Sequence, residues 1–206
     1  MFAFIILDRR KNKLFISRDH FGIKPLYWYH DEKKIVFGSE IKAILAHPEI
    51  SAEPEIENLY EYFTFQFVMG EGTMFRNIFK VLPGHFTTID LASWEINTTK
   101  YWSPDFKIDQ YHTEEYFIDE LKKILTETIT QQLRSDVSLG TYLSGGIDSS
   151  LVTIMAAKIL GKPIKSFSGA FNEGPEFNEL EYARIAANAA HSELYEIFPT
   201  EQEFID

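Results

Sequence analysis

Residues 144–150, with the sequence SGGIDSS, combine residue types that can bind phosphate. The two glycines remove side-chain bulk, so that several backbone N–H groups can point into one concavity. Serine hydroxyls add donors suited to phosphate oxygens. Asp148 is the exception, because a carboxylate repels bound phosphates unless a cation such as Mg²⁺ lies between them. The segment therefore predicts a metal–nucleotide site, although it lacks the GK[ST] ending of a Walker loop.

A strand before this segment and a helix after it would position its residues. Residues 139–143 are expected to form the strand, and residues 149–160 the helix, which Gly161 closes. The positive N-terminal end of such a helix faces the same concavity as the glycine N–H groups. In a purely structural interpretation, the glycines only make a tight turn and Ser149 caps the helix. The full seven-residue string between a strand and a helix favours binding.

The second half of the chain alternates strand and helix. After the first strand and helix, the pattern predicts a strand, a helix and a strand at residues 164–168, 178–190 and 194–197. This βαβαβ order is typical of an α/β domain with a doubly wound parallel sheet, which binds ligands at the carboxyl ends of its strands. The glycine segment lies at such an end.

The first half of the chain predicts an α+β domain. Short runs rich in β-branched and aromatic residues, separated by polar turns, indicate strands. Strands are expected at residues 2–7, 13–17, 26–29, 35–37, 85–89 and 94–98, and helices at 39–46 and 55–66. The two halves therefore differ in fold class.

A linker separates the halves. Residues 101–109 contain Pro104, which disfavours continuation of either a helix or a strand. We therefore expect one domain over residues 1–104 and a second over 105–206. Beyond the linker, Thr113 is expected to cap a helix that has an acidic first turn.

Bulk composition narrows the class of protein. The 206 residues are 45% hydrophobic, which is enough for a substantial core. No apolar run approaches the ~20 residues of a membrane helix, and the start does not resemble a signal peptide, so we expect a cytoplasmic protein with no membrane partner. A net charge of −11 argues against nucleic-acid binding. The lack of cysteine excludes disulfides and thiol nucleophiles within these residues.

Both ends of the sequence look truncated. Residue 1 begins inside a strand with a buried character and no preceding element to pair with it. Thr200 and Glu203 have capping-box spacing, which indicates a helix for which the last residues leave no room. The chain is therefore expected to be a fragment.

The glycine segment resembles the SGGxDS pyrophosphate loop of the ATP-pyrophosphatase superfamily. The longer string SDVSLGTYLSGGIDSSLV resembles the glutamine-hydrolysing asparagine synthetase family in particular. In the first half, the strings MFAFIILD, RDHFGIKPLYW, FGSEIKAILAHP and MFRNIFKVLPGH follow the order of that family. The resemblance extends over nearly the whole chain.

This resemblance implies a role for each half. Residues 1–104 would be the back part of a glutaminase domain of the class II glutamine amidotransferases, which has an N-terminal-nucleophile fold. Residues 105–206 would be the first part of an ATP-pyrophosphatase-type synthetase domain. In the family, this domain binds ATP with Mg²⁺, adenylates the side-chain carboxylate of aspartate and lets ammonia from glutamine attack the acyl-adenylate. The glutaminase cysteine is absent here, so we expect no catalytic residue and no glutamine hydrolysis within these residues.

The resemblance also implies a set of nucleotide-binding residues. Asp148 would help bind Mg²⁺, and Leu143 matches a residue that contacts the nucleotide just before the loop. Gly169 would make a second contact, although the family usually has Ile-Gly or Val-Gly where this chain has Gly169-Ala170. The full set expected to bind ATP or its pyrophosphate is Leu143, Ser144, Gly145, Gly146, Asp148, Ser149, Ser150 and Gly169.

The implied substrates are aspartate, glutamine and ATP, and the resemblance leaves a homodimer of the full-length protein open. Two alternatives also stay open. A related amidotransferase could act on another carboxylate, as β-lactam-forming or polysaccharide-modifying homologues do, because acceptor selection lies largely downstream. The chain could instead be a non-catalytic nucleotide-binding module.

Two further features have structural interpretations. Arg18 and Asp19 could face an ammonia path between domains, but a buried ion pair that fixes a loop is favoured. A stripe of aromatic side chains is interpreted as core or as a domain interface rather than as a base-stacking platform. The stripe consists of Tyr60, Phe63, Phe65 and Phe67.

Overall fold

The computed structural model describes residues 1–170, 174 and 179–205, with the backbone alone at 204 and 205. The chain divides into two compact units, Met1–Lys107 and Ile108–Asp206. The sequence places the domain boundary three residues earlier, between 104 and 105.

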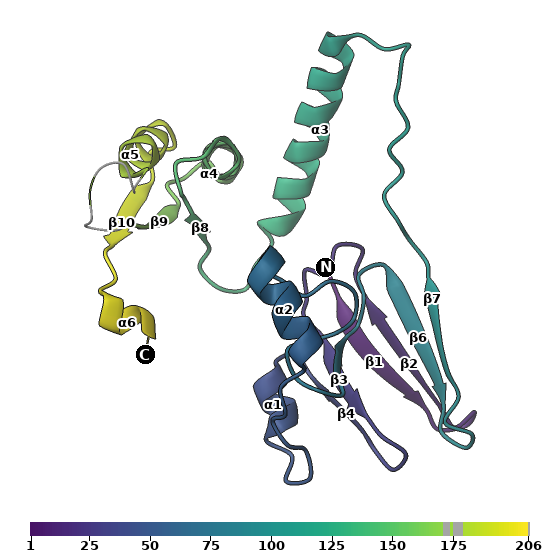
Figure 1. Ribbon diagram of the computed structural model, residues 1–206. Helices are drawn as coiled ribbons and strands as arrows, with labels where there is room; N and C mark the ends of the chain where they lie inside the picture. Colours follow the sequence, from purple (N-terminus) through teal and green to yellow (C-terminus); the bar gives the residue numbers. More distant parts are fainter. Residues whose placement is uncertain (171–173, 175–178, 206) are drawn as a thin grey trace. The chain divides into compact units, whose positions relative to one another are not determined.

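The first unit contains two antiparallel sheets (Figure 1). One has the strand order β1-β2-β6-β7, and the other has the order β4-β3-β5. Their strands are β1 (Ala3–Asp8), β2 (Lys13–Arg18), β3 (Tyr27–His30), β4 (Ile35–Gly38), β5 (Ile78–Lys80), β6 (His85–Asp90) and β7 (Ile96–Lys100). The helices α1 (Ile41–Leu45) and α2 (Ile56–Phe65) lie between β4 and β5 in the chain.

A hydrophobic core joins the two sheets of this unit. Ile16 of β2 and Ile89 of β6 are fully buried, and they cluster with Trp28 of the other sheet. Burial of side chains of this size contributes roughly 1.5–3 kcal/mol each. In a second cluster, Ile44 packs α1 against Ile78 of β5. Along β6 the buried residues Thr87 and Ile89 alternate with half-buried neighbours, which matches the side-chain period of a strand.

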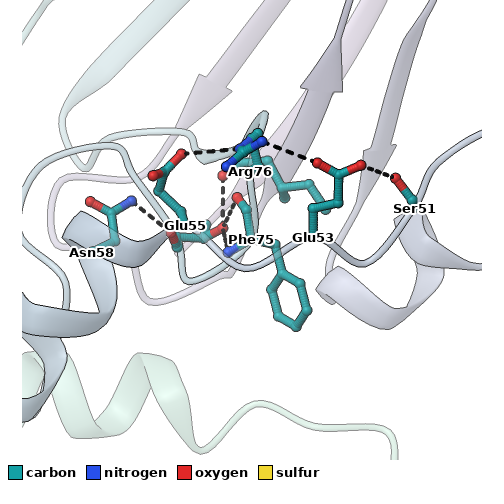
Figure 2. A network of polar contacts seen from close by, with 8 residues as sticks. Ser51, Glu53, Glu55, Asn58, Phe75 and Arg76 are labelled. Atoms are coloured by element: carbon teal, nitrogen blue, oxygen red, sulfur yellow. Dashed lines mark hydrogen bonds and ion pairs between the residues drawn. The ribbon is translucent and has the colours of Figure 1, made fainter.

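A surface network connects the segment before α2 to the segment before β5 (Figure 2). Arg76 Nη1 lies 3.2 Å from Glu53 Oε2, and Arg76 Nε lies 3.9 Å from Glu55 Oε2. The Arg76 backbone N–H also donates to the Glu53 carbonyl at 2.8 Å, and the Asn58 amide donates to the Thr73 carbonyl at 2.6 Å. Because exposed ion pairs contribute little, the bonds to backbone carbonyls carry most of this attachment.

Asp19 organises the tight loop that follows β2. Its carboxylate accepts hydrogen bonds at 3.0–3.2 Å from the backbone N–H groups of Phe2, Phe21, Ile23 and Lys24. Burial raises the pKa of Asp19, but the four N–H donors together lower it more, to about 2. The loop is therefore held by the buried, charged carboxylate of Asp19.

Arg18 supports the same loop from the other side. Its guanidinium donates at 2.7–2.8 Å to the carbonyls of Gly22, Lys24 and Val81. Among the described residues, Arg18 and Asp19 form no ion pair with each other, so that prediction is wrong. The physical reason is that each side chain satisfies the backbone groups of a turn that cannot satisfy them itself. The expectation of a fixed loop is confirmed.

The second unit is an α/β arrangement around a parallel sheet. The strand order is β10-β9-β8, and both neighbouring pairs are parallel. Its elements are α3 (Glu114–Gln132), β8 (Gly140–Tyr142), α4 (Ile147–Leu160), β9 (Lys165–Gly169), α5 (Leu180–Ala189), β10 (Glu193–Ile197) and α6 (Glu201–Ile205). Within the described residues the strand order follows the chain order, so the reversal that defines a doubly wound sheet does not occur among them.

Small and hydroxylic residues pack the helices of this unit onto the sheet. Ala183 of α5 clusters with the fully buried Leu143. A chain of hydroxyl groups crosses the same buried layer: Thr153 of α4 donates to Thr141 of β8 at 3.1 Å, and Thr141 lies 3.0 Å from Ser166 of β9. Ser166 then donates to Ser192 at 3.0 Å. Every hydroxyl in this layer has a partner, as buried polar groups require.

Several element boundaries differ from the expectation. α4 begins at Ile147, two residues before the predicted start, and its N-cap is Gly146. The alternative in which Ser149 caps the helix is therefore wrong. β7 begins at Ile96 rather than at 94, since Trp94 has a φ of 59° in the preceding turn. β5 is missing from the expectation, because three residues are too few for a periodic pattern.

The predicted caps at Thr113 and Thr200 are confirmed. The Tyr116 N–H donates to Thr113 Oγ1 at 3.4 Å at the start of α3. Thr200 and Glu203 form the reciprocal capping box, with the Thr200 N–H donating to Glu203 Oε2 at 2.9 Å. The expectation that this helix has no room to form is wrong, because α6 spans Glu201–Ile205. The first residue of the predicted helix over 178–190 lies outside the described residues.

The aromatic stripe near α2 does not belong to the core of its unit. All four of its side chains are exposed, and α2 buries none of its residues. The core interpretation is therefore wrong, and the interface interpretation stays a prediction.

β1 is also more exposed than its apolar sequence suggests, because it is an edge strand. No helix in the described part of the chain has both the length and the apolar character to cross a membrane.

Candidate functional site

The glycine segment connects the parallel sheet to a helix, as predicted (Figure 1). β8 ends at Tyr142, and α4 begins directly after Gly146, which has extended φ and ψ angles of −67° and 160°. The Ser150 N–H donates to the Gly146 carbonyl at 3.0 Å and closes the first turn of the helix. Residues 144–146 therefore lie at the carboxyl end of β8 and at the positive end of α4.

Gly145 occupies a position that requires glycine. Its φ is +96°, and a Cβ atom there would lie 2.7 Å from the Glu179 carbonyl oxygen and 3.0 Å from the Ala183 N atom. At Gly146, by contrast, a Cβ atom would meet only Ser144 Oγ, at 3.4 Å. Gly145 thus lets the start of α5 approach the loop. Gly146 leaves space beside the loop, because no other segment of the described chain lies against it.

Serine hydroxyls hold the loop in this shape. Ser144 Oγ lies 3.0 Å from Ser149 Oγ and accepts a hydrogen bond from the Gly146 N–H at 3.3 Å. The Ser149 hydroxyl donates to the Gly146 carbonyl at 3.1 Å. The Ser150 hydroxyl has no hydrogen bond to the described residues. Ser144 and Ser149 therefore fix the turn, and Ser150 keeps a donor for a ligand.

Backbone N–H groups at this loop are free within the described part of the chain. Those of Gly145, Ile147, Asp148 and Ser149 meet no acceptor among residues 1–170, 174 and 179–205. The last three belong to the first turn of a helix of 14 residues, where N–H groups point out along the axis. Such a set of donors can bind an anion, and phosphate oxygens are typical occupants.

Asp148 is the acidic residue in the first turn of α4, and its side chain is exposed. In the described part of the chain, no cluster of three or more His, Cys, Asp or Glu side chains could hold a metal alone. Mg²⁺ at nucleotide sites, however, is commonly bound by one or two carboxylates together with phosphate oxygens. A single carboxylate beside an anion site therefore fits Mg²⁺ that arrives with phosphates, and does not fit a free Mg²⁺ ion.

Leu143 and Gly169 flank the loop in different ways. The Leu143 side chain is fully buried, and its N–H donates to the Phe167 carbonyl at 2.9 Å. Gly169 is exposed at the carboxyl end of β9, the strand next to β8, and a Cβ atom there would meet nothing within 4 Å. The structure thus brings Gly169 to the same sheet edge as the loop. The nucleotide contacts of Leu143 and Gly169 stay predictions.

Ser168 is a residue of the site that the sequence reading misses. It is 4% exposed, and its hydroxyl donates to the Leu143 carbonyl directly before the loop. The pairing joins residues 25 positions apart in the sequence, one in β9 and the other directly after the neighbouring strand β8. The only signal in the sequence was a polar residue in a strand next to the glycine segment, which is too common a pattern to be informative.

A cavity of about 340 Å³ lies at the opposite end of α4, lined by residues that include Lys158, Gly161 and His191. It does not include the glycine loop. The C-terminal ends of α4 and α5 present carbonyl groups there, which disfavour anions. The loop is therefore the better candidate for an anion site.

Comparison with known proteins assigns each half of the chain to a domain family. Residues 1–102 match the family model of the glutamine amidotransferase domain, and residues 120–206 match that of asparagine synthase. The chain thus joins a glutamine amidotransferase domain to an asparagine synthase domain. It belongs to the family of glutamine-hydrolysing asparagine synthetases.

Individual relatives agree with this assignment. Asparagine synthetase [glutamine-hydrolyzing] 3 of Bacillus subtilis is 34% identical over 86% of this chain and 29% of the relative, and synthetase 1 of that organism is 35% identical over 92% and 29%. Amidase chyE of Penicillium rubens is 30% identical over 91% of this chain and 30% of the relative. The chain thus spans less than a third of the length of each of these relatives.

Proposed function

We propose that the loop at residues 144–150 binds the pyrophosphate end of Mg-ATP for the synthesis of asparagine. In this proposal the complete enzyme adenylates the side-chain carboxylate of aspartate, and ammonia from glutamine attacks the β-aspartyl-AMP. The observation that carries the proposal is the set of N–H groups at Gly145, Ile147, Asp148 and Ser149 that meet no acceptor among the described residues. Family membership supports the choice of ATP among phosphate ligands.

The chemistry of the loop suits a leaving group. A carboxylate is a poor electrophile. When its oxygen attacks the α-phosphorus of ATP, the bond from that phosphorus to pyrophosphate breaks, and the β-aspartyl-AMP that forms is reactive toward ammonia. Amide N–H groups fixed in advance stabilise negative charge that develops on the departing oxygens, without the cost of reorganising solvent. The hydroxyl of Ser150 adds a donor, and the carboxylate of Asp148 would help hold Mg²⁺, which would neutralise negative charge on the phosphates. The residues of this chain therefore serve the pyrophosphate rather than the amide product.

The proposal extends to the fold and setting of the complete protein. Residues 105–206 would be the first part of a doubly wound sheet of the ATP-pyrophosphatase type, and residues 1–104 the back part of a glutaminase domain. The parallel pairing of β8, β9 and β10 supports the first of these assignments. We also propose a cytoplasmic location and leave the homodimer as a property to be measured on the complete protein.

The glutaminase reaction needs residues beyond these 206. Family members use a cysteine nucleophile, and the sequence contains no cysteine. We therefore propose that the chain by itself binds Mg-ATP and does not release ammonia from glutamine. Glutamine would act as a substrate only of the complete enzyme.

Equilibrium binding of Mg-ATP to the chain tests the loop directly. Asp148→Asn keeps the size of the side chain and removes its charge, so it should weaken binding in Mg²⁺ and tighten the weaker binding of ATP in EDTA, where the carboxylate repels the phosphates. Glu127→Gln, on the exposed face of α3, removes the same charge from a different helix and is the matched control, which should leave binding unchanged. Equal binding curves for wild type and Asp148→Asn in Mg²⁺ would contradict the role of Asp148.

A second assay tests the reaction. The full-length gene product should release pyrophosphate from ATP in the presence of aspartate and glutamine. If pyrophosphate appears only with a different carboxylate acceptor, the asparagine assignment is wrong and the nucleotide site is right. If ATP binds and no acceptor triggers release, the protein is a nucleotide-binding module instead.

A further inference from the structure

A pocket of about 740 Å³ opens in the first unit, away from the nucleotide loop. It lies between the end of β2, the segment that follows α2 and the end of β5. Its wall includes two cationic side chains, Arg18 and Lys80. The proposed function uses none of its residues, and the volume falls within the range of small-molecule sites.

The two cations have no carboxylate partner within ion-pair distance in the described part of the chain. Both are half-buried. Three of the five N–H groups of Arg18 donate to loop carbonyls, which leaves two without an acceptor among the described residues. The Lys80 ammonium donates to the Val68 carbonyl and has two further N–H groups. A half-buried pair of like charges is costly unless an anion compensates it.

The surrounding charges favour a monoanion. Burial, followed by the charge of Arg18, lowers the pKa of Lys80, and the charge of Glu61 opposes this effect. Glu61 is held in place because its Oε2 accepts the Met69 N–H at 2.9 Å. The charges of Arg18 and Glu61 thus act on Lys80 in opposite directions, which leaves the charge of Lys80 itself to be compensated. A singly charged anion would neutralise the pocket, whereas a phosphate dianion would overcharge it.

The rest of the pocket wall is apolar. Phe21, Phe67 and Met69 line it, and all three side chains are exposed to solvent. Exposed large apolar side chains around a cationic centre match a ligand that has an anionic head and an apolar chain. The chain as a whole has a net charge of −11, so general electrostatic attraction would not bring an anion here.

We propose that this pocket binds a small monocarboxylate through Lys80 and Arg18, with an aliphatic chain lying on Phe21, Phe67 and Met69. The carboxylate oxygens accept the N–H groups that have no acceptor, as charge-assisted hydrogen bonds. The aliphatic chain covers apolar surface that is otherwise in water. Affinity should therefore rise with chain length, by about two- to fourfold for each added methylene group.

Hexanoate, butyrate and acetate are suitable probes, and titration calorimetry on the intact 206-residue chain gives their affinities. Amide chemical shifts should change at residues 67–70 and 80–82 on addition of hexanoate. Lys80→Gln should weaken hexanoate binding at least about tenfold, because it removes the ammonium charge that binds the carboxylate. Lys11→Gln removes an equal charge from an exposed turn and should leave the affinity unchanged.

Two further variants keep the proposal falsifiable if Lys80→Gln does not fold. Glu61→Gln retains an acceptor for the Met69 N–H and removes the opposing charge, so it should tighten hexanoate binding. Phe67→Ala should reduce the dependence on chain length and leave acetate binding unchanged. Equal affinity of wild type and Glu61→Gln for hexanoate, or tighter binding of phosphate than of hexanoate, would overturn the proposal.

Discussion

The hydroxyl of Ser168 donates a hydrogen bond to the carbonyl of Leu143, and this contact ties the central strand β9 to the residue directly before the glycine loop. Both groups are buried. The Leu143 N–H also donates to the Phe167 carbonyl of β9. Hydrogen bonds to both the N–H and the carbonyl of Leu143 therefore fix the position at which the chain leaves the sheet. The orientation of the loop N–H groups depends on where the chain leaves β8.

Ser168→Ala should therefore weaken Mg-ATP binding by about three- to tenfold and lower the stability of the second unit by about 1–3 kcal/mol, because the Leu143 carbonyl loses its side-chain donor. Ser166→Ala is the matched control, since it removes a buried hydroxyl of the same strand that has no contact with the loop. Both variants should lose stability, and only Ser168→Ala should lose affinity. Equal affinity of both variants for Mg-ATP would argue against a positioning role.

The two loop glycines should respond differently to alanine. Gly145→Ala combines a φ of +96° with a Cβ atom 2.7 Å from the Glu179 carbonyl, so it should cost at least about 1–3 kcal/mol and abolish Mg-ATP binding. Gly146→Ala has a φ of −67° and a nearest contact of 3.4 Å, so its cost should stay below about 1 kcal/mol. Urea unfolding followed by circular dichroism measures both. Similar losses at the two positions would contradict the close approach of α5 at Gly145.

The stability of the first unit should depend on the charge of Asp19. Its folded-state pKa of about 2 lies below the ordinary 3.8, so the stabilisation is complete above pH 3.8 and is lost as the pH falls through about 2. A difference of this size corresponds to about 2 kcal/mol. Asp19→Asn should be less stable at neutral pH by roughly this amount, and the gap to wild type should close between about pH 4 and pH 2.

Tryptophan fluorescence is a suitable measurement for this variant, because Trp28, Trp94 and Trp102 all lie in the first unit. Asp105→Asn, in the exposed linker, should keep the full pH dependence of wild type. A constant difference between wild type and Asp19→Asn from pH 7 to pH 2 would show that the four N–H donors do not lower the pKa of Asp19.

Limited proteolysis should separate the two units. Phe106 and Tyr111 are 88% and 95% exposed in a segment without helix or strand, and both are chymotrypsin sites. We expect first cleavage after one of them, and two fragments that resist further digestion. Mass spectrometry of the early products gives the cleavage sites. Cleavage within β2, β3 or β6 before the linker would contradict the division into two units.

Local patterns in the sequence predicted most of the elements, because strand alternation and helix caps involve neighbouring residues. Thr113 and Thr200 illustrate this, since each caps its own helix with a residue three positions away. The prediction for Arg18 and Asp19 failed for the opposite reason. Residue type indicates that both are charged, but their partners are backbone groups brought together by the turn after β2.

The sequence by itself determined the composition of the candidate site: two glycines, three serines and one aspartate between a strand and a helix. The tertiary structure decided which of these residues are replaceable and which distant residues support them. Gly145 requires glycine because Glu179 lies against it, and Ser168 of β9 bonds to Leu143 directly after the neighbouring strand β8. Such contacts depend on the packing of segments far apart in the chain, and no pattern of neighbouring residues encodes them.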